Sequence, residues 1–179
     1  MIFDRLFGHA QHPAAQRTAQ TLRVGDAVSY LDEDFTVEQR HELHGDGGDI
    51  WWTFLIQSPE RRLWLDVDED QGLTLTVYEP SAQHVTLPIV DTLTVNGKAF
   101  HQDEHGFAND VVTRRSGESG ERVEYWYLAS DDGDQMVVRR LGDNEITTDP
   151  ALQTGTMEVG IGKEIKTYEL KIYQGEDPH

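Results

Sequence analysis

Alternation of apolar and polar residues at every second position is the feature that most constrains the fold of this chain. Leu63, Leu65 and Val67 alternate with Trp64, Asp66 and Asp68, and the same period recurs in segments 52–56, 73–78, 123–127 and 168–172. Successive side chains of a strand point to opposite faces, so such runs predict half-buried strands. Turn signals such as Asn96-Gly97 and Asp131-Asp132-Gly133 separate them. Many short strands with close turns predict an all-β, antiparallel architecture.

A faint internal duplication refines this prediction. Leu22-Arg23-Val24-Gly25-Asp26 has a counterpart in 93–97, and Ile50-Trp51-Trp52-Thr53-Phe54-Leu55 has one in 123–128. The fold class predicted is therefore all-β, with two pseudo-repeated antiparallel β-meander or barrel-like halves. Chance similarity between β-sequences is the alternative explanation. Helical spacing of apolar residues between Ile2 and Ala10 predicts a short N-terminal helix. The segments expected are 1–21 for the helix and linker, 22–90 for the first β half and 91–175 for the second.

Charge and composition limit the partners. The 179 residues include 33 acidic and 15 basic ones, a formal net charge of -18, so nucleic acid and anionic lipid headgroups are repelled over most of the surface. This charge predicts either a surface that keeps the protein in solution or one that binds a cation or a basic partner. The absence of cysteine excludes disulfides and zinc–thiolate sites. No apolar run approaches a membrane span, so we expect a cytoplasmic protein that meets a membrane only through the N-terminal helix or a partner.

The acidic run Asp66, Asp68 and Asp70 has the spacing with which a calcium loop begins. Such a loop also needs glycine at its sixth position and glutamate at its twelfth, where this chain has Gln71 and Val77. Both flanks read as strands, so we expect the solvent-exposed tip of a hairpin, with the three aspartates as weak metal candidates only. No metal site and no cofactor are predicted.

The same strand suggests a different ligand. Trp64 lies two residues from Asp66 and four from Asp68, so all three share one face of the strand. An exposed aromatic ring beside carboxylates attracts an amine by cation–π interaction and by charge. Trp64, Asp66 and Asp68 are therefore the predicted ligand surface, with ordinary packing of the tryptophan as the alternative.

Catalytic motifs are incomplete. Gly117-Glu118-Ser119-Gly120-Glu121 lacks the closing glycine of a nucleophile elbow, and His41-Glu42-Leu43-His44 is one residue short of HExxH. His101 and His105 flank a predicted turn, where they would either converge on a metal or simply be solvated. Carboxylates suitable for a hydrolase are present, but in so acidic a chain their presence does not favour a hydrolase over any other function. No catalytic residue is predicted and the protein is not expected to be an enzyme.

Several segments, in order and spacing, resemble the bacterial domain-of-unknown-function family DUF4178. They are Leu22 to Val28, Phe35-Thr36-Val37, Trp52 to Leu55, Leu63 to Val67, Val95 to Phe100, Glu104 to Ala108, Val123 to Tyr127 and Gly155 to Val159. The sequence departs from the family pattern at Phe100, where tyrosine is favoured, and at Val137-Val138-Arg139-Arg140. The family has no established activity. The resemblance implies association with phage-shock-type membrane-stress proteins, small membrane proteins and polyamine-synthesis-like enzymes.

These observations lead to a ranked set of functions. The first is a non-catalytic β-rich interaction module with a protein partner, in a membrane-stress-associated complex. The alternative is a binder or sensor of cations or polyamines that uses the acidic, aromatic surface. A hydrolase is third. The oligomeric state and the identity of the partner are not predicted.

Overall fold

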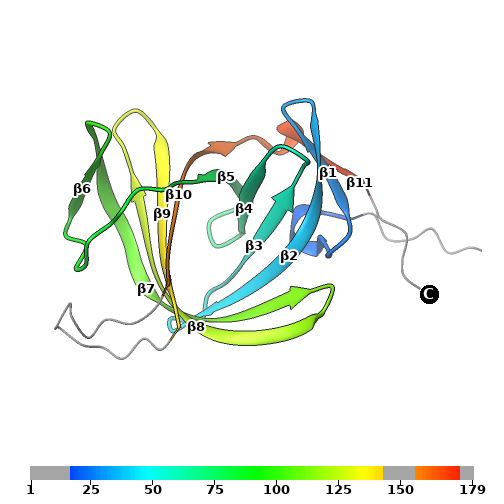
Figure 1. Cartoon of the computed structure of the whole chain (residues 1–179), viewed down its shortest axis with the longest axis horizontal. Helices are drawn as coiled ribbons and strands as arrows, with labels where there is room; N and C mark the ends of the chain where they lie inside the picture. Colours follow the sequence, from blue (N-terminus) through cyan, green and yellow to red (C-terminus); the bar gives the residue numbers. More distant parts are fainter. Residues whose placement is uncertain (1–16, 143–155, 174–179) are drawn as a thin grey trace, which may run out of the picture.

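The fold is all-β, as the alternation predicted. The computed structural model describes residues 17–142 and 156–173, and the strands in these ranges join one antiparallel sheet (Figure 1). The strands are β1 (Ala27–Tyr30), β2 (Glu33–Gly45), β3 (Ile50–Gln57), β4 (Arg62–Asp68), β5 (Thr74–Pro80), β6 (Thr92–Val95), β7 (Lys98–Arg114), β8 (Gly117–Ala129), β9 (Asp134–Leu141), β10 (Thr156–Ile165) and β11 (Leu170–Tyr173). Two 3₁₀ turns, η1 (Ala19–Thr21) and η3 (Thr167–Glu169), are the helical segments described. The predicted N-terminal helix, between Ile2 and Ala10, lies outside the described residues.

Two-residue turns connect several neighbouring strands. Asn96 and Gly97 both have positive φ, 51° and 79°, between β6 and β7. This is the backbone of a type I′ turn, whose twist matches that of a hairpin. Leu31 and Asp32 make the β1–β2 connection with φ of 51° and 60°, although leucine rarely adopts this conformation. The first turn was predicted from its sequence and the second was not.

The strand order explains the overall shape. It runs β11-β1-β2-β3-β4-β5-β10-β9-β8-β7-β6, so β1–β5 and β6–β10 are consecutive meanders joined through β5 and β10. A further pairing between β2 and β7 closes a ring of β2, β3, β4, β5, β10, β9, β8 and β7. In Figure 1 the long β7–β8 hairpin passes along the bottom from the β6 side toward β2. β6 and the β1–β11 pair extend the sheet beyond the ring.

β2 takes part in both the ring and the extension. Its residues 33–36 pair with β1, whereas Gln39–Gly45 pair with β7. The register with β3 shifts between Val37 and Gln39, which is a bulge at the point where β2 changes partners. A bulge bends a strand and increases its twist. Along the edge opposite β3, β2 therefore pairs first with β1 and then with β7.

Apolar residues form two main clusters outside the ring. One is centred on Phe54, Leu65 and Phe35, and another on Trp126, Leu128 and Met136. Leu65 is fully buried, as predicted for the apolar face of its strand. Each meander thus has its own apolar core. Ile165 and Leu170, near the end of the chain, pack in the first cluster, and β11 pairs with β1.

Glycines let β10 approach β5 closely inside the ring. A Cβ on Gly160 would lie 2.9 Å from the Cβ of Tyr78. A Cβ on Gly162 would overlap the carbonyl oxygen of Val77 and lie 2.7 Å from the Cα of Tyr78. Because the atoms that a Cβ on Gly162 would meet are backbone atoms, which cannot move aside like a flexible side chain, this position requires glycine, and Gly160 leaves little room for a side chain. Within the described residues no helix is long and apolar enough to cross a membrane.

Candidate functional site

The predicted ligand residues lie on the inner face of the ring. Trp64, Asp66 and Asp68 share one face of β4, as the alternation required. However, Asp66 is only 7 % exposed, so the expectation that it faces solvent at a hairpin tip is wrong. The reason is ring closure, because β8 and β9 pass across the face that would otherwise be solvated. Asp68 and Asp70 are exposed, and the β4–β5 connection is a hairpin as expected.

A buried ion pair crosses the ring at Asp66. Nη2 of Arg139, on β9, donates to Oδ1 and Oδ2 of Asp66 at 2.8 and 2.9 Å and lies 2.9 Å from Oγ1 of Thr53. Arg139 is 5 % exposed. Since a buried charge is costly unless it is paired and hydrogen-bonded, these partners stabilise one another. The pair connects the two meanders through the interior.

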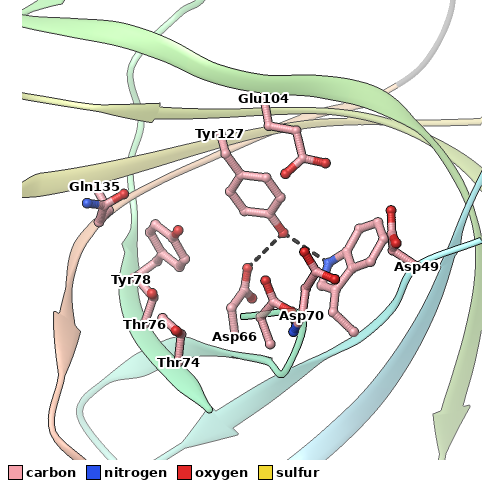
Figure 2. Close-up of a pocket in the computed structure, with 11 residues that line it drawn as sticks. Asp49, Asp66, Asp70, Thr74, Thr76, Tyr78, Glu104, Tyr127 and Gln135 are labelled. Atoms are coloured by element: carbon pink, nitrogen blue, oxygen red, sulfur yellow. Dashed lines mark hydrogen bonds between the residues drawn. The ribbon is translucent and has the colours of Figure 1, made fainter. Parts of the chain in front are cut away.

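Tyr127 extends this network toward the opening of the ring. Its hydroxyl donates to Oδ2 of Asp66 at 3.0 Å and accepts from Nε1 of Trp51 at 3.0 Å (Figure 2). Burial of the hydroxyl, and then the charge of Asp66, raise the pKa of Tyr127 well above its ordinary value. The phenol therefore remains a neutral donor at physiological pH. Trp51, Tyr127, Asp66 and Arg139 form a fixed polar floor.

Trp64 contacts this floor through Arg139. The guanidinium carbon of Arg139 lies 5.5 Å from the centre of the Trp64 ring, and His41 meets the same ring edge-on at 5.3 Å. The predicted combination of a tryptophan, a carboxylate and a cation therefore exists here. The cation in it is the protein's own Arg139. An external ligand would have to meet carboxylates nearer the opening.

A cavity of about 380 Å³ lies above the floor, at the open end of the ring. None of the described residues that line it is basic. The carboxylates come from the β2–β3 turn, from the β4–β5 hairpin and from β7, and hydroxyl and aromatic side chains complete the wall (Figure 2). The lining residues are Asp49, Trp51, Asp66, Asp68, Asp70, Thr74, Thr76, Tyr78, Glu104, Tyr127 and Gln135.

The carboxylates at the opening differ in the hydrogen bonds that they accept from other groups of the protein. Oδ1 of Asp68 accepts the backbone N–H of Asp70 at 2.9 Å, which stabilises the hairpin turn. Oε1 of Glu104 accepts the hydroxyl proton of Tyr125 at 2.8 Å. Burial and this contact with Glu104 raise the pKa of Tyr125. Of the lining carboxylates, only Asp66 has a guanidinium partner among the described ion pairs, so the opening carries an excess of negative charge.

Metal ligation by side chains receives no support in the described part of the chain. There, no group of three or more His, Asp or Glu side chains is arranged to hold a metal ion. His101 and His105 lie on β7 and not at the predicted turn. His105 stacks on Trp126 at 4.9 Å and bonds Glu124 at 2.9 Å, whereas His101 lies 3.1 Å from Oγ1 of Thr92. The two histidines thus have separate partners.

Sequence reasoning did not assign several residues of this site. Arg139, Tyr127 and Glu104 come from the second meander, more than thirty positions from the acidic run. A usable signal did exist for Arg139, because a charged residue interrupts the apolar run of β9 and a buried cation needs an anion. Nothing in the sequence identified Asp66 as that anion.

Comparison with known proteins places the chain in a family. The family described as "Domain of unknown function (DUF4178)" matches residues 23–166, which include the strands of the ring. Searches of curated proteins and of solved structures found no match. A match over most of the chain confirms the resemblance seen in the sequence: the protein belongs to the DUF4178 family.

Proposed function

We propose that this protein is a non-catalytic binding module that takes a small organic cation, an amine, into the acidic end of the strand ring. The observation that supports this proposal is the cavity itself. It combines carboxylates from both meanders with aromatic rings and has no basic residue among its described lining. Such a cavity attracts positive charge and disfavours anions.

The chemistry of the wall favours an amine with methylene groups over a bare ion. The rings of Trp51, Tyr78 and Tyr127 offer apolar and cation–π contacts. The carboxylates of Asp49, Asp70 and Glu104 can accept hydrogen bonds from ammonium groups. A cavity of about 380 Å³ lies within the range that small-molecule sites occupy. A linear polyamine has both the charges and the apolar spacer that this wall would contact.

Thermal unfolding of the full chain tests this proposal against a panel of putrescine, spermidine, spermine, magnesium and calcium at fixed ionic strength. We expect saturable stabilisation by at least one polyamine, since a ligand that binds only the folded state raises its stability. Glu104→Gln, which removes one charge at the opening, is expected to weaken binding about tenfold, roughly 1.4 kcal/mol. Glu60→Gln, an exposed site outside the cavity, is the matched control. Equal shifts for every cation, or for both variants, would argue against a site.

A second candidate function is a protein-interaction module. Within the described residues, β6 and β11 each pair on one side only, which leaves two open sheet edges. Open edges can pair with a strand of another chain. Thr94→Pro in β6 would then abolish recovery of a co-purified partner while polyamine-dependent stabilisation persists. Retention of the partner by this variant would exclude the β6 edge as the site that binds the partner.

Several finer expectations belong to the same proposal. We place the protein in the cytoplasm, with membrane contact only through the N-terminal segment or a partner, and in a membrane-stress context. We also propose that the meanders β1–β5 and β6–β10 are related halves. Their apolar faces support this, since Leu63 and Leu65 correspond to Met136 and Val138 at an offset of 73 residues. The cavity would then lie between the two halves.

A further inference from the structure

A second pair of acidic residues lies where the ring closes. Asp110 of β7 is directly opposite Glu121 of β8 in the antiparallel register. Directly opposed residues have Cβ atoms about 5 Å apart on the same face of the sheet, and like charges at such positions are destabilising. The face is the inner one, since Ala108 and Val123, each two residues away, belong to the interior cluster with Trp51.

Asp110 also connects β7 to β2. Its Oδ2 lies 2.7 Å from Nδ1 of His41, and both side chains are more than nine-tenths buried. His41 Nε2 lies 3.2 Å from Oε1 of Gln39. We call β2, β7 and β8 around these contacts the closing seam. Asp110, at its centre, contacts strands on both sides.

One oxygen of the Asp110 carboxylate lacks a hydrogen-bond partner within residues 17–142 and 156–173. Oδ1 is buried and makes no hydrogen bond among the described residues, whereas buried carboxylate oxygens are ordinarily satisfied. The opposed carboxyl group of Glu121 is the neighbour that could supply a proton to it. Asp110 is buried and Glu121 is half-buried, and two carboxylates this close that are partly shielded from water cannot both ionise cheaply.

The charged groups that act on Glu121 lie on β2, β7 and β10. Burial is the largest influence and raises the pKa of the Glu121 carboxyl, and Asp110 of β7 and Glu158 of β10 raise it further. His41 of β2 and Arg114 of β7 oppose this effect. The net direction is upward, which favours the protonated acid.

We propose that Asp110 and Glu121 form a proton-sharing pair in which Glu121 donates to Oδ1 of Asp110, and that loss of this proton weakens the closing seam. The inference is independent of the amine-binding proposal, because neither residue lines the cavity. It assigns a pH-sensitive element to the strands that close the ring. The expected consequence is that ring closure is firmer in mild acid than in alkali.

The direction in which stability changes with pH follows from the linkage between proton binding and folding. Since the pKa of Glu121 is higher in the folded chain than in the unfolded chain, the folded state binds this proton more tightly. The stabilisation is fully present below the unfolded pKa and is lost as the pH rises through the folded pKa. We expect Glu121→Gln, whose amide donates at every pH, to remove this fall in stability above the ordinary glutamate range.

Denaturant unfolding from pH 4 to pH 9 tests the proposal on the wild type, Glu121→Gln and the exposed control Glu118→Gln. The expected result is that Glu121→Gln equals the wild type at the acidic end, becomes the more stable protein as the pH rises, and that Glu118→Gln follows the wild type. An unchanged pH slope in Glu121→Gln, or a loss of stability at every pH, would overturn the proposal.

A spectroscopic titration keeps the test valid if the variant fails to fold. The ¹³C signal of the Glu121 carboxyl in the wild type is expected to titrate above the ordinary glutamate range, and Asp110→Asn is expected to lower its midpoint. A midpoint at or below that range, or one that Asp110→Asn does not move, would contradict a shared proton.

Discussion

Replacing Asp66 by Asn is expected to lower the free energy of unfolding by about 3 to 5 kcal/mol, the cost of leaving one member of a buried ion pair without its counter-charge. Arg139 would retain its hydrogen bond to Thr53 but face a neutral amide in an interior where it is 5 % exposed. Tyr127 would also lose its charged acceptor. Urea or guanidinium unfolding at neutral pH measures the change.

Asp68→Asn is the matched control for this variant. Asp68 lies on the same strand and on the same face, two positions further along, but it is exposed. Its replacement is expected to alter stability by no more than about 0.5 kcal/mol, as is typical of surface sites. If Asp66→Asn and Asp68→Asn had similar small effects, the ion pair across the ring would not be a structural element.

Replacing Gly162 by Ala is the other change for which we expect a large loss, about 3 kcal/mol or more. The new Cβ would overlap the carbonyl oxygen of Val77, which is backbone and has no rotamer to change. β5 and β10 would have to separate at a pairing that joins the two meanders.

Gly120→Ala provides the comparison, because a Cβ on this strand glycine would have its nearest neighbour, the carbonyl oxygen of Asp110, at 3.7 Å. Alanine there is expected to be neutral or to stabilise by up to about 1 kcal/mol through the smaller entropy of the unfolded chain. Circular dichroism during thermal and denaturant unfolding would measure both variants. Equal behaviour of the two alanines would mean that β5 and β10 are further apart than described.

Local signals in the sequence were sufficient for several strands and for some turns, although the turn expected between His101 and His105 lies within β7. The period of two placed Leu65 in an apolar core, and Asn96-Gly97 marked the hairpin between β6 and β7. The β1–β2 turn was not predictable in this way, because Leu31 and Asp32 carry no common turn signal and the pairing of the flanking strands imposes their conformation.

Local signals in the sequence did not predict which strands pair with one another over long range. The polar face of β4 looks in sequence like a solvated face, and only the β2–β7 pairing converts it into the inside of a ring. Adjacent residues Arg139 and Arg140 show the same effect. Arg139 pairs with Asp66 inside the ring, and Arg140 pairs through Nε with Glu124 at 2.9 Å on the opposite face. Periodicity separates the two faces of a strand but does not identify what covers each one.

The structure changes the set of residues that we propose for ligand binding. Sequence reasoning identified an acidic, aromatic surface of Trp64, Asp66 and Asp68. In the folded chain, Trp64 and Asp66 contact Arg139, whereas Asp68 lines the cavity together with Asp49, Asp70 and Glu104. The amine-binding hypothesis therefore now concerns a cavity with walls from both meanders.

The most direct test is isothermal titration calorimetry of spermidine into the full chain at fixed ionic strength, with Glu104→Gln and Glu60→Gln in parallel. We expect one saturable site per chain, with an affinity that Glu104→Gln weakens about tenfold and that Glu60→Gln leaves unchanged. Heat that does not saturate, or equal affinities for the two variants, would mean that the acidic cavity does not bind amines.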